Sequence, residues 1–301
     1  MRALASLVIA VGLLLSGTAL ADKNADTYYK EGLAYKQEGK IDEAITAMTA
    51  AVTTNPNHGM AWASLGHLYK QKKDLAKSID AYEHAIKFLK KDKIVWENLA
   101  MAYANSEPTR LDDAITAMTT ACQLDLKDGE IRGKLGTLLR KKGDYPKAIV
   151  ELEFATKLKP DEADYWHNLG VAYRFSKRED DAIKAYVKAI GLAPNEARYH
   201  FDLGAAYRRK QDPDKAIPEY EKATSLDPGN ADGWFDLGFM YKENHENDKA
   251  VLALQHYLEA NRGKDSAGAK RAEEECSQLG GKCGEKADKK PPEKKPPPKK
   301  K

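Results

Sequence analysis

The sequence lacks the short motifs that commonly create a catalytic or metal-binding site. It has no glycine-rich phosphate loop, no Gly-x-Ser-x-Gly elbow, no His-Glu-x-x-His pair and no cluster of cysteine ligands. Its seven histidines are scattered along the chain. We therefore predict that the protein is not an enzyme and that it uses no metal, no cofactor and no small-molecule substrate.

Aromatic residues are also scarce. They make up 8% of the 301 residues, whereas charged residues make up 32%, and the mean hydropathy is −0.66. This composition is typical of a helical array with much solvated surface and predicts no membrane-embedded body. Basic residues do not alternate with aromatics, as they do in single-strand binders, and the body of the chain is slightly acidic. We therefore expect no nucleic-acid partner.

Residues 1–21 predict a secretory signal peptide. Arg2 is followed by an apolar run from Ala3 to Leu15 and by small residues that end at Ala21. The alternative is an uncleaved anchor helix, although the apolar run is short for a bilayer span. We expect cleavage near Ala21 and a location in the periplasm or outside the cell.

The three cysteines predict one disulfide in an oxidising compartment. Cys276 and Cys283 are seven residues apart and flank a Leu-Gly-Gly sequence that can end a helix and reverse the chain. Closing so short a loop contributes about 2 to 3 kcal/mol. The alternative is two free thiols. Cys122 lies among apolar positions and is expected to be a small core residue.

A period of 34 residues runs through most of the chain. Glycines recur at this spacing, and Ala100 takes their place in one unit that has two extra residues: Gly32, Gly66, Gly136, Gly170, Gly204 and Gly238. Tryptophans precede the small residue by four positions: Trp62, Trp96, Trp166 and Trp234. Tyr28, Arg132 and His200 occupy this tryptophan position in the other units. A second series of small residues runs from Ala44 to Ala250.

This pattern resembles the tetratricopeptide repeat. The fifth unit meets all of the family's positions, with Trp166, Leu169, Gly170, Tyr173, Ala182, Tyr186, Ala189 and Pro194. Residues 22–262 then form the array, with repeats at about 25–58, 59–92, 93–128, 129–162, 163–196, 197–230 and 231–262. The resemblance implies an all-α fold, a right-handed superhelical solenoid of about seven helix-turn-helix repeats. Together with the signal-peptide pattern of residues 1–21, it indicates a family member of the exported bacterial type.

The spacing has a physical reason that does not depend on the family. Thirty-four residues hold two helices of roughly thirteen residues and two short turns. Small side chains such as Gly170 and Ala182 let the two helices of a pair approach closely. Each pair is apolar on more than one side, so it must stack on a neighbour, with the first helices lining an inner groove.

The last repeat needs a cap, and residues 263–284 predict one. Ala269, Ala272, Cys276 and Leu279 place a weakly apolar stripe on a helix that is followed by the cysteine loop. Residues 285–301 then contain eight lysines against three acids, with runs of proline, and are expected to be disordered. This tail either attaches to an anionic surface or serves only as a solubilising terminus.

The inner groove carries our candidate partner-binding residues. Basic residues stand in the last turn of the first helices: Lys36, Lys70, Arg140, Arg174, Arg208 and Lys242. Aromatic and histidine side chains lie between the two ends of the first helices: Tyr29, His67, His167, Phe201, Phe235 and Phe239. Acids such as Asp164, Asp202 and Asp236 lie nearer the helix starts. The alternatives are that the charges complement the helix dipoles and that the rings pack between neighbouring helices.

We therefore predict a non-enzymatic protein-binding scaffold of the bacterial cell envelope. It would hold an extended partner segment in its concave groove and help an envelope complex to assemble or be placed. The rival interpretation is a surface-attachment protein whose basic Lys/Pro tail binds anionic lipid or polymer.

Overall fold

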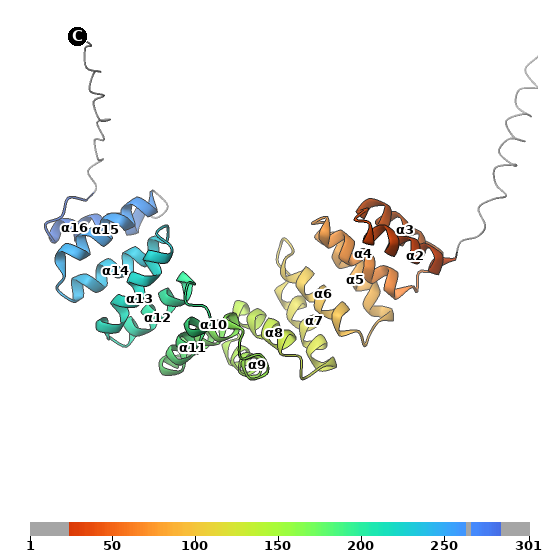
Figure 1. Ribbon diagram of the computed structural model, residues 1–301, viewed down its shortest axis with the longest axis horizontal. Helices are drawn as coiled ribbons and strands as arrows, with labels where there is room; N and C mark the ends of the chain where they lie inside the picture. Colours follow the sequence, from red (N-terminus) through yellow and green to blue (C-terminus); the bar gives the residue numbers. More distant parts are fainter. Residues whose placement is uncertain (1–23, 263–265, 284–301) are drawn as a thin grey trace, which may run out of the picture. The chain divides into compact units, whose positions relative to one another are not determined.

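The computed structural model describes residues 24–262 and 266–283, and every regular element in these ranges is an α-helix. Their order is α2 (Ala25–Gln37), α3 (Ile41–Thr54), α4 (Gly59–Gln71), α5 (Leu75–Phe88), α6 (Lys93–Ala104), α7 (Leu111–Leu124), α8 (Gly129–Lys142), α9 (Tyr145–Leu158), α10 (Ala163–Phe175), α11 (Glu179–Leu192), α12 (Ala197–Arg209), α13 (Pro213–Leu226), α14 (Ala231–Glu243), α15 (Asn247–Asn261) and α16 (Ser266–Gln278) (Figure 1). The signal peptide and the Lys/Pro tail predicted above lie outside the described residues.

The helices form pairs, and the pairs belong to two compact units. Unit 1 ends at Pro160 and holds four pairs, from α2 with α3 to α8 with α9. Unit 2 begins at Asp161 and holds three pairs followed by α16. Within each unit the second helix of a pair packs against the first helix of the next pair. This arrangement confirms the predicted all-α solenoid of paired repeats.

The glycine period marks the contact between the two helices of a pair. A Cβ atom added to Gly170 would lie 2.6 Å from the Tyr186 ring, and one added to Gly66 would lie 2.7 Å from the Tyr82 ring. The second series of small residues is fully buried at the same contacts, where Ser78 replaces alanine. The Ser78 hydroxyl donates to the Gly66 carbonyl at 2.8 Å, which satisfies a polar group inside the core.

A residue with left-handed backbone conformation lies in the turn inside six of the seven pairs. Two are glycines, Gly39 and Gly143, with φ of 75° and 84°. The equivalent positions in other pairs carry larger side chains in the same conformation: Lys73, Lys177, Gln211 and His245, with φ between 59° and 61°. The turn geometry therefore requires a positive φ that only glycine adopts without cost.

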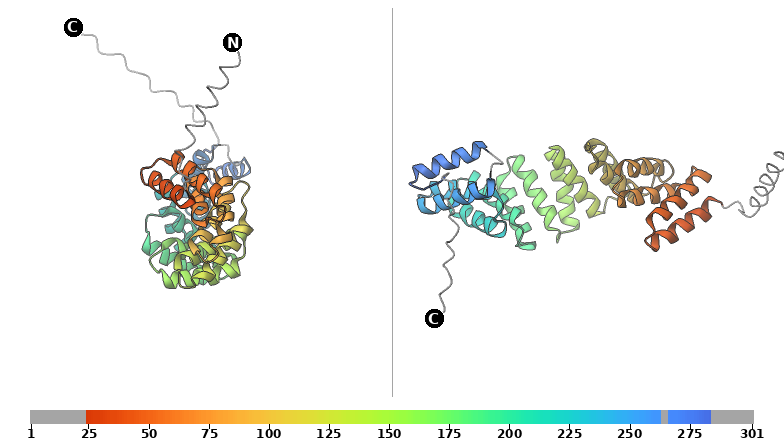
Figure 2. Two further views of the ribbon diagram at one scale, coloured as in Figure 1. Left: turned by 90° about the vertical axis from the view of Figure 1, so that its right-hand side faces the viewer. Right: turned by 90° about the horizontal axis from the view of Figure 1, so that it is seen from above.

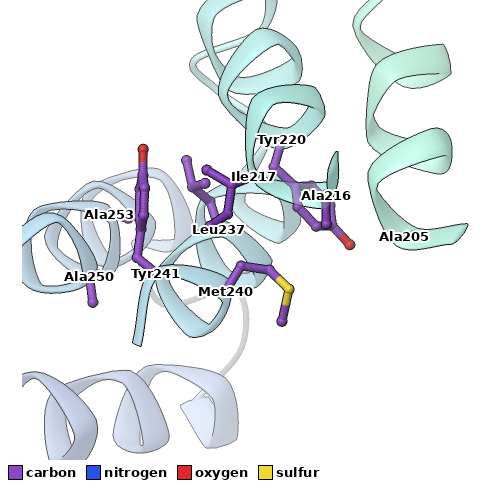
Figure 3. Packing of buried hydrophobic residues seen from close by; sticks show 9 residues of the cluster. All are labelled: Ala205, Ala216, Ile217, Tyr220, Leu237, Met240, Tyr241, Ala250 and Ala253. Atoms are coloured by element: carbon purple, nitrogen blue, oxygen red, sulfur yellow. The ribbon is translucent and has the colours of Figure 1, made fainter. Parts of the chain in front are cut away.

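The core of unit 2 shows how neighbouring pairs share their apolar residues. Leu237, Met240 and Tyr241 from α14 pack against Ile217 and other residues of α13, and further members of the cluster come from α12 and α15 (Figure 3). All are buried. No pair encloses its own core, so each depends on its neighbour for stability.

Helix α16 closes the end of unit 2 against α15 (Figure 2). Its Ala272 and Cys276 are fully buried and pack with Leu254 and Tyr257 of α15. Cys276 is joined by a disulfide to Cys283, with their Cα atoms 6.0 Å apart, while Cys122 is a buried free thiol. Among the described residues, no helix is long and apolar enough to cross a membrane.

Candidate partner-binding faces

The first helices of the pairs carry the candidate residues, so we define a first-helix face for each unit. It comprises α2, α4, α6 and α8 in unit 1 and α10, α12 and α14 in unit 2. Neighbouring first helices contact each other directly, as α4 does with α6 and α10 does with α12. Side chains on this face can therefore bridge adjacent repeats.

In unit 2 the basic residues in the last turns of the first helices, which we call the basic row, are paired with acids two helices further along the chain. An Arg208 Nη atom lies 2.6 Å from Asp236, and an Arg174 Nη atom lies 3.6 Å from Asp202. Lys242 forms an ion pair with Glu275 of α16. The two arginine pairs share a spacing of 28 residues, a signal in the sequence that could have predicted them. Arg174, Arg208 and Lys242 therefore join repeats instead of offering free charge to a partner.

The acids of these pairs make additional contacts inside unit 2. His167 Nε2 lies 2.7 Å from an Asp202 carboxylate oxygen, and Tyr220 donates its hydroxyl to Asp236 at 3.1 Å. Burial raises the pKa of Asp236, and the neighbouring Arg208 opposes that shift. Asp202 and Asp236, two of the acids near the starts of the first helices, are therefore part of the contact between repeats.

Unit 1 is different, because Lys36 and Lys70 have no acidic partner among residues 24–262 and 266–283. Both lysines act on His67 of α4. Burial lowers the pKa of His67, and the positive charges of Lys36 and Lys70 lower it further. Lys36, His67 and Lys70 thus form one electropositive cluster on the first-helix face of unit 1. Arg140, the row's member on α8, is already engaged in an interaction.

The aromatic candidates divide between the two units. Tyr29 is half-buried, with its ring centroid 4.8 Å from that of His58. His167 is buried and stacks on Tyr199 at 4.7 Å, and Phe201 meets the edge of Tyr220. These residues of unit 2 are parts of its packing.

Phe235 and Phe239 are candidate anchors for a partner or packing residues, and the structure places them against the last helix. Their rings contact each other at 4.7 Å and belong to the apolar cluster that includes Ala272 and Cys276 of α16. Arg271 of α16 lies 4.3 Å from the Phe239 ring. These two phenylalanines therefore pack against α16 and help to hold it on unit 2 as a cap. Helix α16 occupies the place that a following repeat would take.

The tryptophan position has a specific polar role that the sequence did not reveal. The indole N–H of Trp62 donates to the Pro56 carbonyl at 2.8 Å, six residues earlier, and Trp96 and Trp234 make the equivalent bond. Arg132 Nε makes this bond to Leu126 at 2.8 Å, and His200 Nε2 lies 3.0 Å from the Pro194 carbonyl. Tryptophan, arginine and histidine are interchangeable here because each offers an N–H that reaches the preceding turn.

A stack of paired helices held together in this way defines an α-helical repeat scaffold. Models of the tetratricopeptide repeat match residues 29–93, 163–196, 197–230 and 219–251, and a model described as TPR repeat matches residues 136–174. The chain belongs to the tetratricopeptide-repeat family, whose members are typically non-enzymatic scaffolds that bind proteins or peptides.

Curated relatives match this chain over part of their length. The chain is 25% identical over 200 residues to Superkiller protein 3 of Schizosaccharomyces pombe, covering 62% of this chain and 14% of that protein. It is 26% identical over 208 residues to the peroxisomal targeting signal receptor of Saccharomyces cerevisiae, covering 56% of this chain and 34% of the receptor. The chain thus spans at most about a third of the length of these relatives.

Solved structures share the fold. The MamA protein is 26% identical with a TM-score of 0.53, covering 56% of this chain and 91% of that one. The C-terminal part of a repeat protein from Cytophaga hutchinsonii is 18% identical with a TM-score of 0.64, covering 80% of this chain and 98% of that one. YrrB is 22% identical with a TM-score of 0.55, covering 65% and 99% respectively.

Proposed function

We propose that this protein is an exported scaffold of the bacterial cell envelope that binds an extended, acidic segment of a partner protein. The binding surface is the first-helix face of unit 1, around Lys36, His67 and Lys70. The partner segment lies across α2 and α4, and the complex helps an envelope assembly to form or to be placed.

The unpaired cations of unit 1 carry this proposal. Lys36 and Lys70 are half-buried and lie close enough to His67 to depress its pKa, yet no acid among the described residues neutralises them. Clustering like charges costs free energy, and an acidic ligand would offset that cost. The half-buried Tyr29 on α2 adds an aromatic contact beside the charges.

Two relatives support a peptide-binding role in general. The peroxisomal targeting signal receptor is by its name a receptor of a targeting signal, and YrrB is described as a TPR protein with an unusual peptide-binding site.

Export and an envelope location rest on the signal-peptide pattern of residues 1–21. Mass analysis of the mature protein from the periplasmic fraction tests export: a chain that begins at Asp22 supports it, and an uncleaved cytoplasmic chain contradicts it.

The binding surface can be tested with a fluorescent oligo-glutamate peptide and three forms of the full chain. Lys36→Glu with Lys70→Glu should weaken binding by about tenfold or more, because two attractive charges become repulsive. Lys188→Glu with Lys222→Glu in unit 2 makes the same change in net charge and should leave most of the affinity. All forms keep the basic tail, so equal loss in both variants would mean that net charge alone drives binding and would contradict the proposed site.

A photo-crosslinking residue then identifies the natural partner. Placed at Tyr29, it should capture a protein in cells of the native host, and the Lys36→Glu, Lys70→Glu change should abolish that product. The same group at Lys188 is the matched control. A product of equal yield from both positions would argue against a specific partner at the first-helix face.

A further inference from the structure

The turns between the repeats of unit 1 carry large apolar side chains that remain exposed. Ile94 and Leu126 are 59% and 60% exposed, and four other large apolar residues at these turns are exposed as well: Met60, Phe88, Leu124 and Leu158. They lie next to the turns at 55–58, 89–92 and 125–128, where one pair ends and the next begins, and next to the turn at 159–160, with which unit 1 ends. Exposed apolar residues that recur at successive turns mark an interaction surface.

These turns lie side by side along one edge of unit 1. A Cβ atom added to Gly59 would lie 3.0 Å from Phe88 Cβ, which places the first two turns together. Lys93 Nζ lies 2.6 Å from Asp125, which joins the second turn to the third. A Cβ added to Gly129 would lie 2.8 Å from Leu158 Cβ, which joins the third to the fourth. We call this row of turns the turn edge.

Exposed lysines without acidic partners alternate with the apolar residues. In the described ranges, five lysines at the turn edge form no ion pair: Lys87, Lys90, Lys91, Lys127 and Lys157. Several neighbouring acids are engaged, since Asp125 and Asp128 hold Lys93, and Asp92 accepts backbone hydrogen bonds at the start of α6. Glu130 contacts Lys134 and Lys159. Asp161 and Glu162, at the end of this row, are exposed and form no ion pair in the described ranges. The second and third turns, which carry Ile94 and Leu126 beside most of these lysines, are therefore the apolar and electropositive part of the turn edge.

The corresponding turns of unit 2 resemble the first turn of unit 1, which contains Pro56 and Asn57, and differ from the second and third turns. Pro194-Asn195-Glu196 and Pro228-Gly229-Asn230 occupy these places. The large apolar residues that are exposed in the described part of unit 2 lie elsewhere, at Phe175, Val187 and Leu252. The turn edge is thus a property of unit 1 and not of the repeat as such.

We propose that the turn edge of unit 1 docks on the surface of an anionic lipid membrane. Apolar side chains at successive turns can enter the headgroup region one by one, while the lysines between them remain at the level of the lipid phosphates. A bilayer accepts such separated side chains, whereas a folded protein partner would need a continuous apolar patch. This docking uses neither the first-helix face nor the basic tail.

Flotation of the full chain with vesicles tests the proposal. The chain should bind vesicles that contain phosphatidylglycerol and should not bind vesicles of pure phosphatidylcholine. Ile94→Ser with Leu126→Ser, and separately Lys90→Glu with Lys91→Glu and Lys127→Glu, should each weaken binding by about tenfold or more. The control is Val187→Ser with Lys188→Glu and Lys222→Glu, which makes the same kinds of substitution at exposed helix positions of unit 2 and should have little effect. Circular dichroism checks that each variant is folded.

The salt dependence of vesicle binding distinguishes attachment through the turn edge from attachment through the basic tail. Attachment through a basic tail alone disappears at high salt, whereas apolar insertion leaves residual binding that Ile94→Ser with Leu126→Ser removes. Equal binding by the turn-edge variants and the wild-type chain would overturn the proposal, as would the absence of binding to anionic vesicles. Loss of a defined acidic protein partner in these variants, without any vesicle binding, would also overturn it and would replace the membrane with that protein.

Discussion

Arg208 of α12 and Asp236 of α14 form a 2.6 Å ion pair that joins two successive repeats of unit 2. The carboxylate is largely buried and also accepts a hydrogen bond from Tyr220. A buried carboxylate that loses its cation is left uncompensated, which costs more than the pair itself contributes. The arginine is therefore a structural residue, although its place in the basic row suggested a role in binding.

We predict that Arg208→Ala destabilises the protein by about 2 to 4 kcal/mol at neutral pH, measured by urea unfolding. The pKa of Asp236 is already raised by burial, so protonation of this carboxyl favours the folded state. The stabilisation from this protonation is fully present below the ordinary carboxyl pKa of the unfolded chain. It is lost as the pH rises through the higher pKa of Asp236 in the folded protein. The penalty of Arg208→Ala should therefore grow from pH 4 to pH 7, and a pH-independent penalty would contradict this account. Lys70→Ala is the control and should change stability little.

Binding of an acidic segment at unit 1 should be coupled to proton uptake by His67. In the free protein the pKa of His67 is lowered by burial and by Lys36 and Lys70, so the ring is neutral at pH 7. A bound acidic segment opposes the field of the lysines and raises this pKa, so affinity should increase as the pH falls through the histidine range. Calorimetry with oligo-glutamate in two buffers of different ionisation enthalpy measures the uptake. His67→Gln should abolish it, and uptake that persists in this variant would assign the proton elsewhere.

Replacing each of two glycines in unit 2 by alanine should change the free energy of unfolding in opposite directions. Gly170→Ala should destabilise by about 1 to 3 kcal/mol, since the new Cβ would lie 2.6 Å from the Tyr186 ring. Gly191 of α11 has open space around it, and Gly191→Ala should stabilise by about 0.5 to 1 kcal/mol through higher helix propensity. Thermal and urea unfolding of the two variants measure both effects. A stabilising Gly170→Ala change would show that the helices of this pair separate at little cost.

Removal of α16 should destabilise unit 2. A chain that ends at residue 262 would expose Phe235, Phe239 and Tyr257, which now pack with α16. We expect a loss of about 2 to 4 kcal/mol from the lost burial and the lost disulfide, together with increased binding of an apolar dye. A chain that ends at residue 284 lacks only the tail and should match the full chain. Equal melting temperatures for the chains ending at 262 and 284 would remove the capping role.

Much of the fold could be predicted from the sequence because the period itself encodes it. Gly170 and Ala182 can repeat at fixed spacing only where two helices approach closely, and the match between Gly170 and Tyr186 confirms that reading. The capping helix was also visible, since Ala272 and Cys276 lie on its apolar stripe. These features depend on local spacing within one or two repeats, which the sequence displays directly.

Which side chains remain available to a partner was decided only by the tertiary structure. Lys70 and Arg208 occupy equivalent places in the sequence, yet Arg208 is paired with Asp236 and Lys70 has no acidic partner within the described residues. Phe239 resembled an open anchor until α16 was placed over it. The sequence by itself determined the helix pairs and their order, because these follow from a repeated local pattern. Free charge and exposed surface depend on contacts between repeats, where a single substitution on a neighbouring helix changes the outcome without altering the period.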